Sequence, residues 1–361
     1  MLSYSPNLAI QTSAADVLVN TVNTVGTMGK GLALDMKNAF PKILAPYKEA
    51  CKSGNLQPGT FQMLRANDRQ FVLNLATKQD WRDPSRYEWI GVGLVYMNRY
   101  LEAQSDRFSS LAMSMPGSGN GGLEADRVQQ MMRIYLHRAM EAGIQIEVSF
   151  EELAPLMDQP FYAGVGSRAT PQDTLDLMAE VGGLMTEAGF RLRSGGAIGA
   201  DSAFWNGARE VDPAGMEIFL PKAKSQIPDG ILHMSPVFER LAKNFHTHPA
   251  GITPDPGNPN DKRHYFLKLM ARNGNQIFGT DFRNPSNAVI CWTKGGKGEG
   301  GTGQAIRLAS SVGIPVIDLG RPDLAGIRAV DVRDLAVEKI TMFRQSRGLP
   351  QLDRDIAPTP C

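Results

Sequence analysis

Many of the 37 glycines in this chain lie in five short segments, each placed where a strand-like run gives way to a helix-like run. The first half holds loop one (residues 20–31) and loop two (residues 116–122), and the second half holds segments 163–168, 194–201 and 295–303. Glycine allows backbone N–H groups to approach a ligand closely, and the N-terminus of the following helix favours anions. This repeated succession predicts layered α/β folds whose glycine turns meet at the carboxyl ends of parallel strands.

The order of these runs predicts two domains. Residues 1–150 alternate strand-like and helix-like runs in the manner of a three-layer α/β domain, and residues 151–160 form an acidic connector with two prolines. Residues 161–346 repeat the alternation in the manner of a mostly parallel, doubly wound sheet, with long loops expected within residues 222–287. Residues 347–361 are rich in proline and are expected to form a disordered tail.

Composition narrows the classes of protein further. Lys and Arg number 38 and Asp and Glu number 37, so the net charge of +1 argues against a nucleic-acid binder that works through overall charge. No stretch approaches the roughly 18 apolar residues of a membrane helix, and the first residues lack the features of a secretory signal. The three cysteines, Cys51, Cys291 and Cys361, lie far apart, which disfavours disulfides and structural zinc. We therefore expect a cytoplasmic protein without a membrane partner.

Three motifs of the first half occur in the order found in macrodomains. Residues 19–34 read VNTVNTVGTMGKGLAL, residues 74–82 read NLATKQDWR, and residues 116–123 read PGSGNGGL. Together they resemble macrodomains of the DNA-ADP-ribosyl glycohydrolase branch, the DarG-like branch. The resemblance implies a three-layer macrodomain that holds ADP-ribose or a related nucleotide as its ligand and requires no cofactor.

The resemblance also implies where the ADP-ribose pocket lies. Asn23 is expected beside the distal ribose, and the two glycine loops are expected to wrap around the diphosphate. The predicted contact residues are Asn20, Asn23, Met28, Gly29, Lys30, Gly31, Thr77, Gly117, Ser118, Gly119, Asn120, Gly121 and Gly122.

Lys78 matches the catalytic lysine of this family. A lysine in a partly desolvated cleft has a lowered pKa, so its neutral amine can attack an anomeric carbon. In its charged form the same lysine can instead donate a proton to the leaving base or stabilise it electrostatically. The plainer alternative is a surface lysine beside Asp80. Some relatives carry a helper carboxylate within loop two, whereas here Asn120 occupies the loop and Glu124 and Asp126 follow just beyond it.

The three glycine segments of the second half resemble those of the SLOG superfamily, which includes the DprA proteins and the LOG phosphoribohydrolases. The resemblance implies a Rossmann-like, nucleotide-binding SLOG domain. Its predicted contact residues are Gly164, Gly166, Ser167, Arg168, Ser194, Gly195, Gly196, Asp201, Gly300, Gly301, Thr302, Gly303 and Gln304. LOG enzymes place a glutamate after the glycine–threonine turn, and the neutral amide of Gln304 cannot act as a base, so nucleotide binding is expected while turnover of the nucleotide stays open.

Two residues of this predicted SLOG site have alternative roles, and a metal site is not expected. Arg168 either pairs with a phosphate or is an ordinary exposed arginine. Asp201 either contacts a ribose hydroxyl or stabilises the N-terminus of its helix. His246 and His248, with His233 and His264 nearby in the sequence, have no clear third ligand beside them.

Three functions remain open at this point. The first is an ADP-ribosyl glycohydrolase that removes ADP-ribose from a modified base or protein through Lys78, coupled to a SLOG domain and acting in conflict between phages and bacteria. The second is a non-catalytic binder of ADP-ribose or other NAD-derived signalling nucleotides. The third is DprA-like binding of single-stranded DNA, which needs a basic groove with stacking aromatic residues. The expected partners are a small molecule that contains ADP-ribose or ADP-ribosylated DNA or protein, and the SLOG resemblance implies a homodimer.

Overall fold

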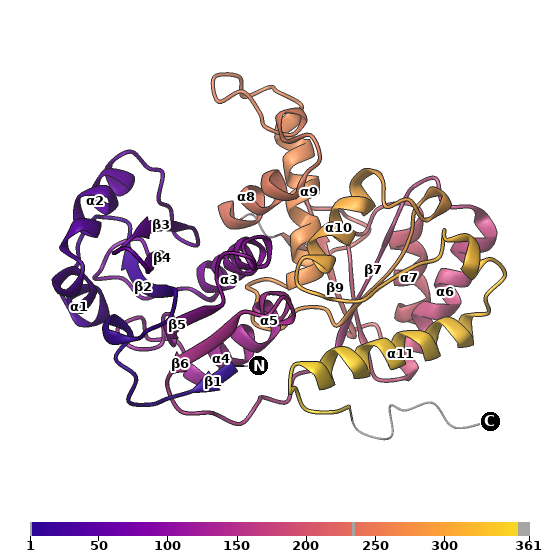
Figure 1. Cartoon of the computed structure of the whole chain (residues 1–361). Coiled ribbons are helices and arrows are strands. Elements are labelled where there is room, and N and C mark those ends of the chain that lie inside the picture. The colour runs from indigo at the N-terminus through magenta and orange to yellow at the C-terminus, as the bar shows by residue number, and fades with distance from the viewer. Residues whose placement is uncertain (1, 233–234, 353–361) are drawn as a thin grey trace. The chain divides into compact units, whose positions relative to one another are not determined.

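The computed structural model describes residues 2–232 and 235–352 of the chain. The chain divides between Leu156 and Met157 into two compact units, called here the N-terminal unit and the C-terminal unit (Figure 1). Of the tail predicted at residues 347–361, residues 353–361 lie outside the described residues.

Six strands form the sheet of the N-terminal unit, in the order β1-β6-β5-β2-β4-β3. Their bounds are β1 Leu2–Tyr4, β2 Val17–Asn23, β3 Phe61–Arg65, β4 Phe71–Lys78, β5 Ser110–Ser114 and β6 Gln145–Ser149. All neighbours pair in parallel except β3, which runs antiparallel to β4. Because β2 lies between β5 and β4, loop one, loop two and Lys78 come together at one edge of the sheet.

Helices cover both faces of this sheet, so the predicted three-layer α/β fold is confirmed (Figure 1). The helices are α1 Gly31–Ala39, α2 Leu44–Lys52, α3 Tyr87–Ala103, α4 Ala125–Tyr135 and α5 His137–Glu141, with the short 3₁₀ turns η1 Ile10–Thr12 and η2 Pro41–Ile43. On one face, Met36 of α1 and Tyr47 of α2 pack with Leu18 of β2. Val17, Leu18 and Val19 are all fully buried, as expected for a strand covered on both sides.

The C-terminal unit holds a second six-stranded sheet, in the order β10-β9-β8-β7-β11-β12, with every pair of neighbours parallel. Its strands are β7 Phe161–Gly166, β8 Arg191–Ser194, β9 Met216–Leu220, β10 Ile231–Leu232, β11 Ala288–Trp292 and β12 Val316–Asp318. The chain begins at β7, moves outward through β8 and β9, and then crosses back to β11 and β12. The predicted doubly wound sheet is therefore confirmed. The direction in which successive strands are added to the sheet reverses between β7 and β11. In open α/β sheets, ligands bind at the point of this reversal.

The helices of the C-terminal unit pack on both faces of this sheet (Figure 1). They are α6 Gln172–Glu187, α7 Ala200–Val211, α8 Pro236–Phe245, α9 Arg263–Phe278, α10 Gly300–Ser310 and α11 Ala329–Ser346, with the 3₁₀ turns η3 Pro249–Gly251, η4 Lys294–Gly296 and η5 Pro322–Leu324. Helix α6 contacts both α7 and α11 on one side, and α8, α9 and α10 contact one another on the other side.

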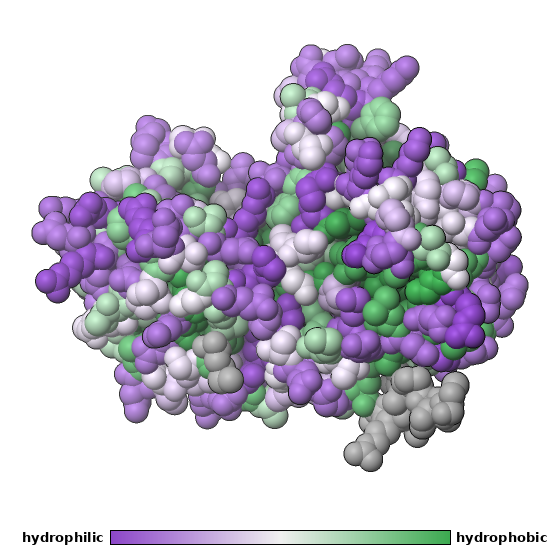
Figure 2. All heavy atoms as spheres, turned by 45° about the vertical axis from the view of Figure 1, so that its right-hand side comes forward, coloured by the Kyte–Doolittle hydropathy of each residue, from purple (hydrophilic) through white to green (hydrophobic). Residues whose placement is uncertain are grey.

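The segment of residues 222–287 contains a long loop, as expected, and it also contains two helices, α8 and α9, that the sequence analysis did not place. Ser235 accepts a hydrogen bond from the Val237 N–H at 3.3 Å and caps α8, and Pro236 occupies the first turn. The buried apolar residues of α8 recur at helical spacing and anchor it to the unit. Residues 246–262, which join α8 to α9, do form a projecting loop, and hydrophilic side chains cover most of it (Figure 2).

Candidate active site

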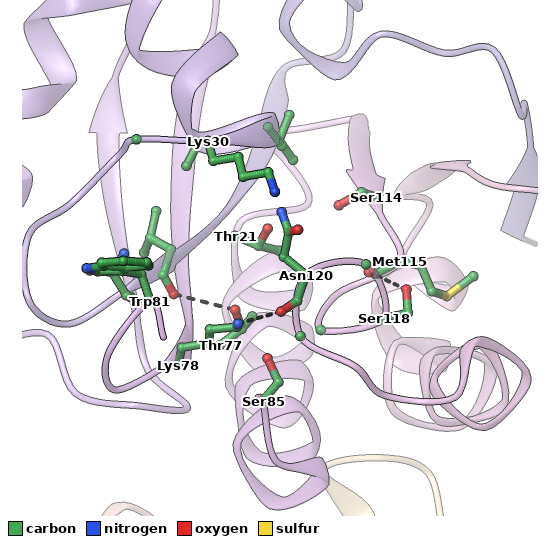
Figure 3. Close-up of a pocket in the computed structure, with 18 of the residues that line it drawn as sticks. Thr21, Lys30, Thr77, Lys78, Trp81, Ser85, Ser114, Met115, Ser118 and Asn120 are labelled. Atoms are coloured by element: carbon green, nitrogen blue, oxygen red, sulfur yellow. Dashed lines mark hydrogen bonds between the residues drawn. The ribbon is translucent and has the colours of Figure 1, made fainter. Parts of the chain in front are cut away.

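A cavity of about 750 Å³ lies at the carboxyl ends of β2, β4 and β5 in the N-terminal unit (Figure 3). Its volume is in the range of small-molecule sites. The predicted contact residues that line it are Asn23, Gly29, Lys30, Thr77, Lys78, Gly117, Ser118, Gly119, Asn120 and Gly121. The parallel strand order therefore brings loop one, loop two and Lys78 to a single cavity.

The amide of Asn23 shapes loop one from within. Its Oδ1 accepts hydrogen bonds from the N–H groups of Val25 at 3.1 Å and Thr27 at 3.2 Å, and its Nδ2 donates to the Thr27 carbonyl at 2.6 Å. The Tyr47 hydroxyl lies 2.8 Å from the Asn23 carbonyl oxygen and 3.1 Å from Oδ1. Asn23 lines the cavity as predicted, but most of its hydrogen-bonding capacity serves the loop rather than a ribose.

Lys78 ends β4 and reaches across the cavity to loop two. Its Nζ donates a hydrogen bond to the Asn120 carbonyl oxygen at 2.6 Å (Figure 3). Burial lowers the pKa of the Lys78 amine from its ordinary value of 10.5, and the Asp83 carboxylate partly opposes this shift. Asp80 instead pairs with Arg82, at 3.5 Å. The structure therefore supports the cavity lysine over the surface lysine beside Asp80.

Loop two is a tight turn with no room for a side chain at Gly121. The Leu123 N–H donates to the Gly117 carbonyl at 3.0 Å, and the Ser85 N–H donates to the Gly121 carbonyl at 2.9 Å. A Cβ at Gly121 would stand 2.1 Å from the Gly117 oxygen, which no real structure tolerates. Glu124, one of the two carboxylates beyond the loop, accepts a hydrogen bond from the Tyr87 hydroxyl at 3.1 Å and does not line the cavity.

Four of the predicted contact residues do not line the cavity, and each has a structural role instead. Met28 is 3% exposed and packs with Met36 in the core beneath α1. Asn20 is fully buried in the sheet, where its Nδ2 donates to the Asn74 Oδ1 at 2.8 Å. Gly31 and Gly122 supply positive φ angles of 58° and 75° at the start of α1 and at the end of loop two.

Several lining residues were missed by the sequence analysis. These are Thr21, Val22, Thr27, Leu32, Ala33, Trp81, Arg82, Ser85, Ser114, Met115, Ser149 and Phe150. Trp81 is 54% exposed, and the Arg82 guanidinium lies 4.9 Å from its ring centre. The sequence did indicate Trp81 and Arg82 as lining residues, because they follow Lys78 within the motif at residues 74–82. Ser149 and Phe150 carried no such signal, because they enter the cavity only through the pairing of β6 with β5.

In the C-terminal unit, basic side chains surround the glycine turn that follows β8. The Lys224 Nζ donates to the Gly196 carbonyl at 2.7 Å, and the Arg272 Nη1 donates to the Gly195 carbonyl at 2.7 Å. Burial lowers the pKa of Lys224, and the charge of Arg272 lowers it further, with smaller effects from Lys222 and the exposed Arg168. We call Arg168, Lys222, Lys224 and Arg272 the cationic cluster. Arg168 is the one member that was predicted from the sequence.

Asp201 is the carboxylate that faces this cluster. It is 2% exposed in the first turn of α7, and its Oδ2 accepts from the Ala197 N–H at 3.3 Å and lies 3.6 Å from the Arg272 Nη2. Burial raises the pKa of Asp201, and the Arg272 charge opposes this. Of its two predicted roles, these contacts support stabilisation of the turn and helix start over contact with a ribose.

Other predicted residues of this half serve packing. Gln304 is fully buried, where its Oε1 accepts from the Asn273 Nδ2 at 3.0 Å and its Nε2 donates to the Ala242 carbonyl at 2.9 Å. The prediction of Gln304 as a ligand contact is therefore corrected, because its amide joins α8, α9 and α10. The buried Ser194 hydroxyl likewise donates to the Gly164 carbonyl at 2.7 Å.

Some of the remaining glycines of the predicted SLOG site are required for close packing, and others are exposed. A Cβ at Gly164 would stand 2.7 Å from the Phe204 ring, one at Gly166 would stand 2.5 Å from the Ala200 Cβ, and one at Gly303 would stand 1.8 Å from the Gly298 oxygen. These three positions therefore need glycine for close packing. Gly300 and Gly301 are exposed at the start of α10, and Thr302 and Ser167 are half-buried.

The histidines considered for a metal site make local contacts. The His246 Nδ1 accepts from the His248 N–H at 3.0 Å, and the His264 Nε2 lies 3.2 Å from the Asn258 carbonyl oxygen. His233 lies outside the described residues. Within residues 2–232 and 235–352, no group of three or more His, Cys, Asp or Glu side chains could hold a metal ion. In the same part of the chain, no helix has the length and apolar character needed to cross a membrane.

Residues 19–132 match the model of the Macro domain family. The match covers the two glycine loops and Lys78, and it begins within β2 and ends within α4. The predicted macrodomain is thus confirmed for the N-terminal region.

Curated relatives and solved structures show what the N-terminal region is similar to. A DNA ADP-ribosyl glycohydrolase of Thermus aquaticus is 39% identical over 136 residues, which are 37% of this chain and 36% of the relative. The chain therefore spans little more than a third of the length of that curated relative. The solved macrodomain of Thermus aquaticus DarG is 36% identical and is matched over 97% of its length and 41% of this chain, with a TM-score of 0.37. Thermosipho africanus DarTG, solved in complex with ADP-ribose, is 30% identical over 40% of this chain and 41% of its own, with a TM-score of 0.36.

Proposed function

We propose that the N-terminal unit hydrolyses an ADP-ribosyl linkage through Lys78. The observation that carries the proposal is the amine of Lys78, which has a lowered pKa and stands between two glycine loops at a cavity of nucleotide size. The similarity to proteins named DNA ADP-ribosyl glycohydrolases supports the same conclusion. A modified DNA base is the substrate we expect first, and a modified protein is the alternative.

Two routes to hydrolysis are consistent with the position of Lys78. In the first, the neutral amine forms a bond to the anomeric carbon while the bond to the base breaks, and the displaced base takes up the proton that the amine loses. Water then adds to the anomeric carbon, which releases ADP-ribose and restores the amine. In the second, the ammonium form donates its proton to the leaving base while water attacks the anomeric carbon directly, and the proton that the water loses restores the ammonium.

Release of free ADP-ribose from a defined substrate tests the proposal. The whole chain is incubated with an oligonucleotide that carries ADP-ribose on a base and, separately, with an ADP-ribosylated protein, and the products are identified by mass spectrometry. We expect ADP-ribose and the unmodified base or side chain. If neither substrate changes while ADP-ribose still binds in calorimetry, the protein is a binder of ADP-ribose, and the glycohydrolase proposal is wrong.

The pH dependence of the reaction separates the two routes. If the neutral amine attacks, kcat/KM rises with pH through the pKa of Lys78, with a midpoint below 10.5 because burial favours the neutral form. If the ammonium donates a proton, kcat/KM falls through the same pKa. Asp83→Asn removes the charge that raises this pKa, so the midpoint should move to lower pH in either case. A profile that is flat in this range, or a midpoint that Asp83→Asn leaves in place, contradicts the assignment to Lys78.

We further propose that the C-terminal unit is a SLOG-like domain that binds the phosphates of a nucleotide through the cationic cluster. The cluster lies at the carboxyl ends of parallel strands, which is a suitable place for an anion, and the carbonyls of Gly196 and Gly195 hold Lys224 and Arg272 there. The same proposal includes coupling between the two units, a homodimer, and a role in conflict between phages and bacteria. Single-stranded DNA, whose backbone also carries phosphates, is the alternative ligand.

Charge removal within the cluster tests the second proposal. Arg168→Ala and Lys222→Ala remove exposed cations, and each should weaken binding of AMP by about tenfold, as expected for a lost charged hydrogen bond. Lys339→Ala on α11 is the matched control and should leave the affinity unchanged. Equal affinities in all three variants would count against the cluster as the phosphate site. Tighter and strongly salt-dependent binding of an oligothymidylate would instead favour single-stranded DNA.

A further inference from the structure

The hydroxyl of Ser85 is buried in the cavity wall without a hydrogen-bond partner among the described residues. Ser85 is 4% exposed, its Oγ is shielded from solvent, and the residue lines the cavity. Buried side-chain hydroxyls almost always have a hydrogen-bond partner. A buried hydroxyl without one, at the wall of a binding cavity, therefore indicates that a ligand supplies the partner. The sequence analysis did not include Ser85.

The surrounding chain holds Ser85 in place by its backbone and leaves its side chain free. The Ser85 N–H donates to the Gly121 carbonyl at 2.9 Å, which fixes the residue beneath loop two. A Cβ at Gly121 would stand 2.5 Å from the Ser85 Oγ, and a Cβ at Gly117 would stand 3.2 Å from the Ser85 Cβ. Two glycines of loop two therefore make the space in which this hydroxyl lies.

The hydroxyl is directed toward the reactive end of the cavity. In Figure 3 it points toward the Lys78 amine and the backbone of loop two at Asn120. If the proposed function is correct, the anomeric carbon of the bound ADP-ribose must lie beside that amine. The group nearest to Ser85 is then the terminal ribose, whose hydroxyls can both donate to and accept from a serine.

We infer that Ser85 is a binding residue for the terminal ribose of ADP-ribose and so positions the anomeric carbon at Lys78. The inference rests on the proposed function for the placement of the ribose. It assigns the neutral hydroxyl to a neutral sugar, whereas the backbone N–H groups of the glycine loops suit the diphosphate. Ser85 therefore should distinguish ligands that carry the terminal ribose from ligands that lack it.

Calorimetry with ADP-ribose and with ADP tests this inference on the whole chain. Ser85→Ala should weaken binding of ADP-ribose by about tenfold, the loss expected for one hydrogen bond, and should change ADP binding by less than about twofold. The melting temperature without ligand should not fall, because the substitution removes a hydroxyl that has no partner. Ser110→Ala is the matched control, since the Ser110 hydroxyl donates to Asp16 Oδ2 at 3.1 Å at the other end of β5. It should lower the melting temperature and leave both affinities unchanged.

The possible outcomes separate this inference from the proposed function. If Ser85→Ala weakens ADP as much as ADP-ribose, the hydroxyl supports loop two and the ribose assignment is overturned. An unchanged affinity for ADP-ribose also overturns it, whether or not the wild-type protein hydrolyses its substrate. If the selective loss is found but no hydrolysis occurs, the ribose contact stands and the glycohydrolase proposal fails alone.

Discussion

Lys78→Ala is expected to abolish release of ADP-ribose from an ADP-ribosylated oligonucleotide, with a fall in kcat of at least about a thousandfold. The substitution removes the amine that either attacks the anomeric carbon or protonates the leaving base, and no other lysine donates across the cavity to loop two in the described part of the chain. Binding of ADP-ribose should persist, because both glycine loops stay in place. Single-turnover kinetics and calorimetry on the same preparations measure the two effects separately.

Two further variants make the Lys78 result specific. Lys37→Ala removes a cation from α1 outside the cavity lining and should leave the rate unchanged. Lys78→Arg keeps a positive charge but has no readily available neutral form, so it should be as inactive as the alanine variant if the amine is the nucleophile. A rate above about a tenth of wild type in Lys78→Ala would remove this residue from the mechanism.

The second large effect is expected from Gly121→Ala in loop two. The added methyl would stand 2.1 Å from the Gly117 oxygen and 2.5 Å from the Ser85 Oγ, so the turn must open. We expect the affinity for ADP-ribose to fall by at least about a hundredfold, because the backbone groups of loop two leave their positions. Overpacking of this kind also lowers the free energy of unfolding by about 1–3 kcal/mol. Calorimetry and chemical denaturation measure the two losses.

Gly119→Ala provides the control within the same loop. A Cβ at Gly119 meets nothing within 4 Å, and its φ lies outside the left-handed region. This variant should unfold at the same denaturant concentration as wild type. An equal loss of unfolding free energy in the two variants would show that any added methyl in loop two, and not the close approach at Gly121, destabilises the turn.

The location of both candidate sites at the ends of strands could be predicted from the sequence, because the residues that indicate it follow one another directly in the chain. An apolar run, a glycine turn and a helical pattern follow one another directly at loop one and loop two, and the structure places both at strand ends. The position of Lys78 opposite loop two followed from the motif at residues 74–82 and from the parallel order of the strands. The same local patterns were sufficient for the doubly wound sheet of the C-terminal unit.

The roles of single side chains could not be predicted, because they depend on partners that are distant in the sequence. Gln304 is turned inward by Asn273, which lies 31 residues earlier on α9. Met28 turns into the core because α1 and α2 cover it, although its neighbours Gly29 and Lys30 line the cavity. The orphan hydroxyl of Ser85 lies beneath a turn 36 residues further along the chain, and no local pattern indicates it.

The network around Asn23 has a consequence for how any titration of the cavity is interpreted. Burial raises the pKa of Tyr47, and it also raises the pKa of the neighbouring Cys51, so both groups keep their protons in neutral and mildly alkaline solution. The hydrogen bonds from the Tyr47 hydroxyl to Asn23 therefore persist over that range, and the part of loop one that they shape has no reason to rearrange when the pH is changed. A titration of the cavity in neutral and mildly alkaline solution then reports on groups other than this network.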